Sequence, residues 1–564
     1  MTEDDDIHKE ALERLDAGMA ADFENDILAE DDLRNLIGDQ WPEEIRRTRE
    51  ASNRPCLTFN KFPQYVRQVT GDLRSMNPAI KVIPADNQAT PETAELIEGM
   101  VRQIQNACDA PSVYETAGET AAACGKGAFR ILTRYCDDNT FDQEVTLQAI
   151  RNPFAVVWDP KAVMPTREDA EWCFVKDRVT EDEFKEMWPD AVVDGVQDDN
   201  RRLLTWKAGD DIVIAEYFWK EPVEKTIGLL PDGTVIDNPK AIHNVTKTRK
   251  VNGHKVMWAK MSAHEILEGP QEFPSKYLPV VAVMGEEIHV GSSVYRSSVI
   301  RHAKDAQRTY NFWRTAQTEV VALQPKVPYL VTAKQIADRE NDWATANTDA
   351  LPYLLYTPDE KAPPPQRLSP PIASSGMMQE VALAGDDIQG TIGIYNAGIG
   401  AASNEKSGIA IQRRQHESDV ATSIYSDNTN KAVLHAGRIV VDMLPKVYDT
   451  TRMVQIVGKD QTTQLAPINA QMQTQDGIMP VHDLSVGKYD VQIAVGPNYS
   501  TKRQETADSM IQVAQSYPML WDKAGDLLVK AMDWPDAEQV SERLKATLPP
   551  GIIGPDQLPP EQQK

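Results

Sequence analysis

Two segments with the periodicity of long helices enclose a proline-rich stretch in the middle of the chain. Between residues 297 and 323, apolar or long side chains recur every three or four positions, so they share one face of a helix. They are Val299, Ala303, Ala306, Tyr310, Trp313 and Val320. A second helix is predicted from about residue 377 to 394, with Met378, Val381, Gly385, Ile388 and Ile392 in register. This order predicts a long helix, a small knob at its end, and a second helix that runs back in the opposite direction.

The knob, residues 324–375, contains nine prolines, which favour turns and edge positions because proline has no backbone N–H. Strands are predicted near residues 329–331 and 351–356 within it. We therefore expect a compact insertion between the two helices.

The opposite face of the first helix is polar. Arg301, Lys304 and Arg308 keep the helical spacing, and Asn311, Thr315 and Thr318 continue it. This face is expected to meet solvent or a lumen. A basic stripe of this kind is compatible with contact to DNA and equally with a plain solvated face.

The chain begins with an acidic segment. Residues 1–50 carry 17 acidic and 6 basic side chains, and their apolar positions follow a helical spacing. Residues 1–39 are therefore predicted to form an acidic helical arm that is partly mobile. Helices are also expected over residues 61–75, 91–106 and 112–124.

Residues from about 127 to 290 are rich in strand patterns. Two alternating runs, 243–250 and 254–261, flank Asn252-Gly253, a dipeptide that suits a tight hairpin turn, so a hairpin is predicted there. Pro231-Asp232-Gly233 indicates a second turn. Thr180 and Glu183 have the spacing of a capping box that opens a short helix ending near Pro189. Together these features predict an α+β fold with an antiparallel sheet.

A glycine-rich loop, residues 396–405, follows the second long helix and contains Gly398 and Gly400. A helical pattern then runs from Lys406 to Leu444 and is expected to end at Pro445. At a rise of about 1.5 Å per residue this helix would be roughly 58 Å long. Strands are predicted at 453–457 and 489–495, helices from Lys502, and a proline-punctuated tail after residue 549.

No motif of catalytic or metal-binding chemistry stands out. Gly118–Gly127 lacks the spacing and the hydroxyl residue of a phosphate-binding loop, and Gly209-Asp210-Asp211 has no partner carboxylate motif. The five cysteines contain no CxxC pair and are interpreted as core thiols.

The formal charge of −26 argues against tight binding of nucleic acid but allows DNA as a cargo that passes through. No apolar run is long enough to span a membrane, and the acidic start is unlike a signal peptide.

Several strings, in order, resemble the portal proteins of short-tailed, podovirus-type bacteriophages. They are Asn53-Arg54-Pro55 with Asn60-Lys61, Gly71-Asp72-Leu73-Arg74, Asn77-Pro78-Ala79-Ile80-Lys81-Val82, Asn152-Pro153 with Trp158-Asp159-Pro160, and Asn404-Glu405-Lys406-Ser407-Gly408-Ile409-Ala410-Ile411 leading to Arg413 and Gln415. The resemblance spans roughly residues 40 to 520. It implies a portal fold assembled as a ring, and no enzymatic activity or cofactor.

The resemblance also implies a division of the chain into named parts. These are an acidic arm (1–39), a wing (40–295 and, with the long helix, 406–500), a stem of two helices (296–323 and 376–394), a clip (324–375), a tunnel loop (395–405), a helical crown (501–548) and a flexible tail (549–564). The apolar stripes of both stem helices would serve in packing within and between subunits.

By the same resemblance, Arg301, Lys304 and Arg308 become candidates for the channel side of the stem. Ser403, Asn404, Glu405 and Lys406 become candidates for the narrowest ring, with loop mobility from Gly398 and Gly400. The implied partners are further copies of this chain, in a ring of twelve, the major capsid protein, scaffolding protein, terminase at the clip, tail adaptors, and double-stranded DNA as translocated cargo. The implied location is the portal vertex of the virion, and the host cytoplasm during assembly.

Two alternatives stay open at this point. Another structural protein of the head-tail junction would also be acidic and without catalytic motifs, but would lack the order of stem, clip and stem. An unrecognised enzyme would need clustered carboxylates or histidines in a pocket, which sequence does not exclude.

Overall fold

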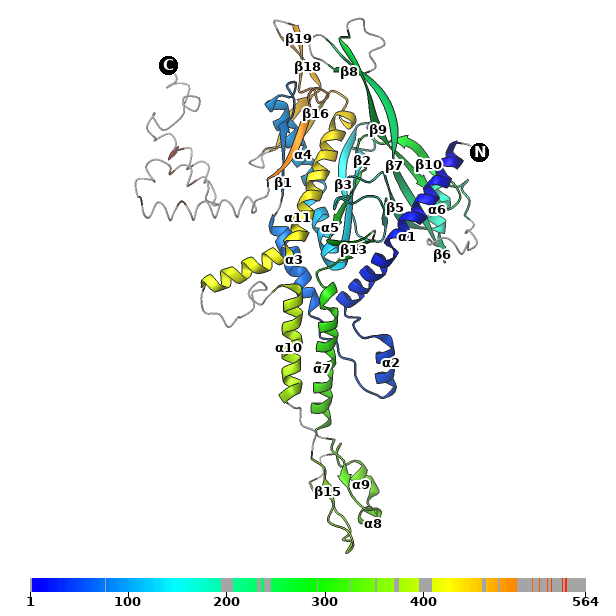
Figure 1. Cartoon of the computed structure of the whole chain (residues 1–564), viewed down its shortest axis with the longest axis vertical. Helices are drawn as coiled ribbons and strands as arrows, with labels where there is room; N and C mark the ends of the chain where they lie inside the picture. Colours follow the sequence, from blue (N-terminus) through cyan, green and yellow to red (C-terminus); the bar gives the residue numbers. More distant parts are fainter. Residues whose placement is uncertain are drawn as a thin grey trace.

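The computed structural model describes residues 3–494 except 77, 194–205, 231–234, 238–244, 292, 325, 350–351, 370–374, 395–407, 459–462 and 475–476, together with seven isolated positions beyond 494. A broad α+β body narrows to a pair of helices, and these end in a small knob (Figure 1). The α+β fold class is confirmed. The predicted crown and tail lie almost wholly outside the described residues, and so does the predicted tunnel loop.

The largest sheet of the body is antiparallel, with the strand order β10-β9-β7-β5-β4 and with β6 and β8 also paired to β7. Its strands are β4 (Val156–Trp158), β5 (Trp172–Thr180), β6 (Lys207–Ala208), β7 (Asp211–Leu229), β8 (Val235–Asp237), β9 (Lys247–Met261) and β10 (Ile266–Glu272). One face of this sheet is aromatic. Phe174, Tyr217 and Trp219 stack in sequence there, and the N-terminal helix covers them.

The hairpin predicted at Asn252-Gly253 is wrong. Both residues lie inside the single strand β9, where Asn252 is opposite Glu224 and Gly253 is opposite Val223 of β7. The two strands pair without interruption from Lys247 to Met261. A turn at Asn252 would break this ladder, so long-range pairing overrides the local turn preference. Strands β7 and β8 flank the predicted turn at residues 231–233, which itself lies outside the described residues.

The capping box predicted at Thr180 is confirmed. Thr180 and Glu183 bond reciprocally at the start of α6 (Glu181–Met187), which ends just before Pro189 as expected. The predicted early helices are also present as α3 (Phe62–Met76), α4 (Pro91–Ala107) and α5 (Ala110–Cys124). The predicted acidic arm forms α1 (Glu3–Ile37), and α2 (Glu43–Ala51) follows it.

The main core lies between a three-stranded sheet and several helices. The sheet has the order β11-β2-β3, formed by β2 (Lys126–Tyr135), β3 (Gln143–Ile150) and β11 (Val280–Met284). Buried side chains of α4, α5 and α11 (Gly408–Val447) pack against it. The long helix was expected to end at Pro445, but it continues to Val447. Pro445 lies in its last turn, where the loss of one backbone donor disrupts little of the helix.

Strand β1 (Ala79–Pro84) pairs with β20 (Tyr489–Ala494), so the body joins early and late parts of the chain. Three hairpins complete it: β12 (Glu286–Val290) with β13 (Ser293–Ser297), β16 (Arg452–Val457) with β17 (Thr463–Ile468), and β18 (Ala470–Thr474) with β19 (Gly477–Val481).

The pair of helices below the body consists of α7 (Lys304–Leu323), preceded by the 3₁₀ turn η2 (Arg301–Ala303), and α10 (Ser375–Ile392), which lie side by side (Figure 1). The knob between them holds α8 (Ala333–Ile336), α9 (Glu340–Ala344) and the strand pair β14 (Tyr329–Leu330) and β15 (Gln366–Arg367). The strand predicted at 351–356 is wrong for the described residues 352–356, since β14 pairs with β15 instead. Among the described helices, none is long and apolar enough to cross a membrane.

We predict that Gly127→Ala destabilises the body. A Cβ atom at Gly127, in β2, would lie 2.0 Å from the carbonyl oxygen of Ala117 in α5, and a backbone atom cannot rotate aside. The cost should be about 1–3 kcal/mol, as for other overpacked cores. Thermal unfolding followed by circular dichroism measures it as a lower melting temperature.

Gly71→Ala is the matched control. Gly71 is an exposed position of α3, and a Cβ atom there meets nothing within 4 Å. Alanine is a better helix former than glycine, so this variant should melt at the same or a higher temperature. Equal destabilisation by the two substitutions would contradict the close approach of α5 and β2.

Candidate functional site

Helix α1 crosses from the body to the top of the stem helices, and its contacting face changes character along its length (Figure 1). Near its start, Ala11 and Leu15 are buried against the aromatic face of the large sheet. At Gly18 a Cβ atom would lie 2.6 Å from Cγ1 of Val157, so the helix approaches the sheet closely there. Further along, the same face carries the buried polar residues Asn25 and Asp32. The arm is thus apolar at one end and acidic at the other.

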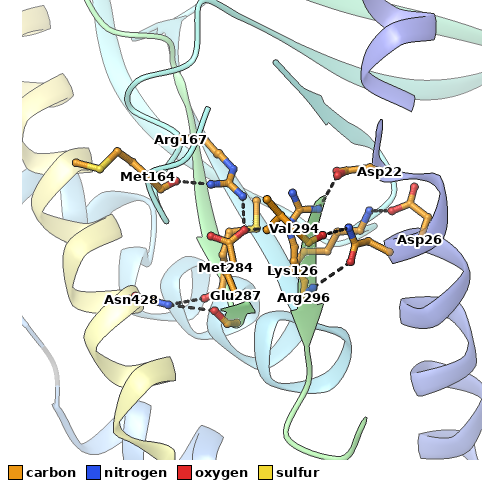
Figure 2. Close-up of polar contacts among 12 residues, drawn as sticks. Asp22, Asp26, Lys126, Met164, Arg167, Met284, Glu287, Val294, Arg296 and Asn428 are labelled. Carbon is orange, nitrogen blue, oxygen red and sulfur yellow. Dashed lines mark hydrogen bonds and ion pairs between the residues drawn. The ribbon is translucent and has the colours of Figure 1, made fainter. Parts of the chain in front are cut away.

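In its middle, α1 binds the β12–β13 hairpin (Figure 2). The guanidinium of Arg296, in β13, forms ion pairs with Asp22 at 2.8 Å and with Glu287 at 3.1 Å. Asn25 donates its amide to the carbonyl oxygen of Val294 at 2.8 Å and accepts the backbone N–H of Arg296 at 3.0 Å. One amide side chain thereby satisfies two backbone groups of an edge strand, which fixes the register of α1 on the hairpin.

A second arginine completes this cluster from the opposite side. Arg167 has 3% of its side-chain area exposed, forms an ion pair with Glu287, and donates to the carbonyl oxygen of Met164 at 2.6 Å. Burial lowers the pKa of Arg167, Glu287 opposes that shift, and the nearby Arg296 charge adds to it. Burial also disfavours the charge of Arg296, but Asp22 and Glu287 outweigh it and raise its pKa. Glu287 is therefore shared by two buried cations.

At its C-terminal end, α1 binds the top of the stem. The carboxylate of Asp32 is fully buried and lies 2.6 Å from the Arg301 guanidinium, and it also pairs with the ammonium group of Lys304. Lys304 pairs in addition with Asp31. Arg308 lies 3.9 Å from Asp31 and 3.3 Å from Asp305, and its side chain is 38% exposed. A buried carboxylate between two cations holds the arm, η2 and α7 in one arrangement.

The predicted polar face of α7 meets solvent only in part. Arg308 and Thr318 reach solvent, whereas Lys304, Asn311 and Thr315 are buried. Gln307 and Asn311 are buried against residues 57–61, an extended segment that follows α2. Gln307 donates to the carbonyl oxygen of Phe59 at 2.9 Å, and Asn311 accepts the N–H of Phe59 at 2.9 Å. Thr315, also buried, donates to the carbonyl oxygen of Leu57 at 3.3 Å. The expectation failed because these side chains satisfy the backbone of a chain segment that has no sheet partner.

The three cations predicted to face the channel therefore differ in how far their side chains are exposed. Arg301 and Lys304 have buried side chains, paired with carboxylates of the same chain, and only Arg308 is substantially exposed. Whether any of them faces a channel depends on an assembly that a single chain does not contain, so that role stays a prediction.

The predicted stem-packing residues lie along the α7–α10 pair with different degrees of burial. Ala303, Ile388 and Ile392 are buried in one cluster, and Val299, Ala306 and Tyr310 pack against it. Trp313, Val320 and Val381 are partly exposed, and Met378 is 57% exposed. The pair is thus tightly packed at its upper end and open towards the knob.

The predicted tunnel residues Ser403, Asn404, Glu405 and Lys406, and the predicted hinges Gly398 and Gly400, lie outside the described residues. Their roles stay predictions. Within the described part of the chain, no three His, Cys, Asp or Glu side chains are grouped to hold a metal ion.

The cysteines are free thiols, as expected, but not all belong to the core. Cys124 and Cys173 are buried, and burial raises the pKa of both, for Cys124 to about 11. Cys136 is exposed, which corrects the core assignment for that residue.

We call the contacts of α1 with the β12–β13 hairpin, η2 and α7 the junction. Of its main residues, the sequence singled out Arg301 and Lys304, but not their partner Asp32 and not the cluster around Arg296. Asp22, Asn25 and Asp32 follow each other at helical spacing, which was a usable signal for one polar face of the arm. Their partners Arg296, Arg301 and Lys304 come from β13, η2 and the start of α7, far along the chain, and no periodicity connects them to the arm.

We predict that Asp32→Asn weakens the junction. The substitution removes the carboxylate that pairs with Arg301 and leaves Lys304 with Asp31, and breaking a buried ion pair in this way typically costs about 3 kcal/mol. The variant should melt at a lower temperature, and limited proteolysis should cleave the α1 segment faster. Asp305→Asn is the matched control, since the 95% exposed Asp305 pairs only at the surface. Similar behaviour of both variants would show that the buried pair does not hold the arm.

Comparisons with known proteins agree with this architecture. The family model described as phage P22-like portal protein matches residues 12–564. A protein named Portal protein, from Acyrthosiphon pisum secondary endosymbiont phage 1, is 25% identical over 497 residues, which cover 80% of this chain and 67% of the relative. The family match extends over nearly the whole chain and includes most of α1, the stem helices and the knob. The chain therefore belongs to the phage P22-like portal protein family.

Proposed function

We propose that this phage portal protein assembles into a closed ring of twelve subunits at one vertex of the capsid. The ring would form the channel through which double-stranded DNA enters during packaging and leaves during ejection. The observation that carries the proposal is the uncovered apolar surface of the two stem helices, which a single chain leaves in water.

That surface consists of large side chains on both helices. Phe312, Val321 and Leu323 of α7 and Met378 and Leu383 of α10 are each between 45% and 57% exposed. Exposed apolar side chains concentrated on one element indicate a protein interface. A head-to-tail contact between the stems of neighbouring subunits would cover them, and a ring is the closed form of such a contact.

We propose a structural role for the ring, without catalysis of its own. The knob would act as the clip, where terminase docks during packaging and tail adaptors bind later. Its exposed Leu330, Tyr353 and Leu355 supply apolar contact area at the far end of the stem. The wing would contact the major capsid protein and scaffolding protein, in the host cytoplasm during assembly and in the finished virion.

The channel lining is assigned to the loop after α10. Ser403, Asn404, Glu405 and Lys406 are proposed to form the narrowest ring, with Arg308 a further candidate on the stem. Arg301 and Lys304 are weaker candidates, since Asp32 already neutralises them within the chain. The strongly acidic composition supports a wall along which DNA slides without binding tightly.

Ring formation is tested by mass photometry and negative-stain imaging of the purified protein. Twelve chains of 62.9 kDa should give a species near 755 kDa with a central hole. Leu383→Glu should shift the protein towards smaller species, because each contact would bury an unpaired carboxylate.

Leu383→Met is the control for this substitution, because it keeps an apolar side chain of similar volume at the same position. Rings formed equally well by the Glu variant would contradict the stem interface. A protein that never forms a ring, even with scaffolding protein present, would contradict the assembly itself.

A second prediction concerns the tunnel loop. Glycine tolerates backbone conformations that other residues do not, whereas proline fixes φ, so Gly398→Pro with Gly400→Pro should stiffen the loop. We expect rings of normal mass but less packaged and retained DNA, measured as nuclease-protected genome per particle. The double alanine variant should be affected less. Unchanged packaging and retention in the proline variant would rule out a moving loop.

A further inference from the structure

A cavity on the body lies between the three-stranded sheet and the large sheet, away from the stem helices and the knob (Figure 1). Its volume is about 700 Å³, within the range of sites that hold a small ligand or a few residues of a peptide. Arg130, in β2, and the stretch from Gln148 to Ala155 form one wall. Residues Val175–Arg178 of β5, with Val213 and Glu216 of β7, form the other.

The lining carries an excess of positive charge on a chain that is strongly negative overall. The cations are Arg130, Arg151, Lys176 and Arg178, and the carboxylates are Asp177 and Glu216. Arg130 is already neutralised by Glu216 at 3.2 Å. Four cations against two carboxylates leave a net charge of +2 in the cavity, whereas the whole chain has −26.

Three of these cations have charged groups without a partner in the described part of the chain. No hydrogen bond or ion pair joins the side chains of Arg151, Lys176 or Arg178 to another described residue. The Asp177 carboxylate accepts the backbone N–H of Arg178 at 2.8 Å and forms no ion pair with the Arg178 guanidinium. The three cations are therefore available to an external anion.

Lys176 is the most informative of the three, because it is half-buried rather than exposed. Burial lowers the pKa of its ammonium group, and the nearby charges of Lys126 and Arg178 add to that shift, while Asp26 opposes it. Asp26 is thus already near Lys176, but no carboxylate is hydrogen-bonded to the half-buried ammonium group, so an anion that enters the cavity would stabilise its charge further.

The other part of the lining is apolar and restricts the type of anion. Ile150, Phe154 and Val213 contribute to it. A nucleic-acid backbone would need a long track of cations, whereas the lining offers four, on a chain whose net charge is −26. A short acidic segment that also carries an apolar side chain matches both parts of the cavity, since its carboxylates meet the cations and its apolar group meets Phe154.

We infer that this cavity is a docking site on the wing for an acidic peptide segment of a partner protein, with carboxylates bound by Lys176, Arg178 and Arg151. This inference concerns binding by a single subunit and does not depend on the ring or on the channel. Failure of ring assembly would therefore leave it standing, and its own failure would leave the ring standing.

Fluorescence anisotropy with the full-length protein tests the site. The probe is a fluorescein-labelled peptide, Glu-Asp-Phe-Glu-Asp-Leu, compared with the same peptide in which Gln and Asn replace Glu and Asp. The acidic peptide should bind and the neutral one should not. Lys176→Gln combined with Arg178→Gln should weaken binding at least about tenfold, because two charge-assisted contacts are lost.

The control removes two positive charges elsewhere on the same sheet. Lys247→Gln with Arg249→Gln changes two exposed cations of β9 that do not line the cavity. This variant should bind the peptide like the unchanged protein. Arg151→Gln is a third variant, on an exposed loop where folding is not at risk, and should weaken binding severalfold. Melting temperatures of all variants show that each is folded.

Three outcomes would overturn the inference. The first is no binding of the acidic peptide by the unchanged protein. The second is equal weakening by the cavity and β9 variants, which would show general electrostatic attraction. The third is binding of a short DNA duplex, lost in the cavity variants, without binding of the peptide, which would assign the site to nucleic acid.

Discussion

The buried carboxylate of Asp32, held between Arg301 and Lys304, is the contact on which the arrangement of the molecule depends. It joins three pieces of chain at the point where the body meets the stem: the end of α1, the turn η2 and the start of α7. The charges are far from water, so each needs the others in place, and a shift of any one piece would leave an unpaired ion. The direction in which the stem leaves the body follows from this geometry.

The junction combines buried ion pairs and amide contacts with an apolar cluster, against which Leu33 and Leu36 of α1 pack. Such ion pairs add little net stability, because desolvation offsets most of their attraction. They do require a defined geometry, since a buried charge without its partner is costly. Arg296 needs both Asp22 and Glu287, and Asn25 matches two backbone groups of one strand. We infer that the junction serves orientation, while the apolar clusters of the body supply most of the stability.

In this member of the portal family, the body supplies stability and the junction sets the orientation of the stem helices. The body gains its stability from a large core that joins early and late parts of the chain through β1 and β20. The stem helices pack tightly only near the junction and leave apolar side chains uncovered towards the knob. A chain built in this way has a well-packed base, a defined direction of α7 and α10, and apolar side chains that stay exposed on these helices. The cavity beside β5 adds a separate polar site on the body, distant from the stem surface.

The sequence by itself determined the elements whose signals are local. Helical spacing predicted α3, α4, α5 and α10 within a few residues, whereas α7 begins only at Lys304 and the predicted start at residues 296–297 belongs to β13. Thr180 with Glu183 predicted the start of α6, because a cap involves only neighbouring residues. Tertiary structure decided the rest. Asn252-Gly253 has the local preference of a turn, yet it lies within β9 because β7 offers a partner along its whole length. Lys304, Asn311 and Thr315 have the composition of a solvated helix face, yet they are buried because a distant segment brings carboxylates and unpaired backbone groups to them. Periodicity identifies which residues share a face, but only the packed chain determines what that face meets, since the partner comes from elsewhere in the sequence.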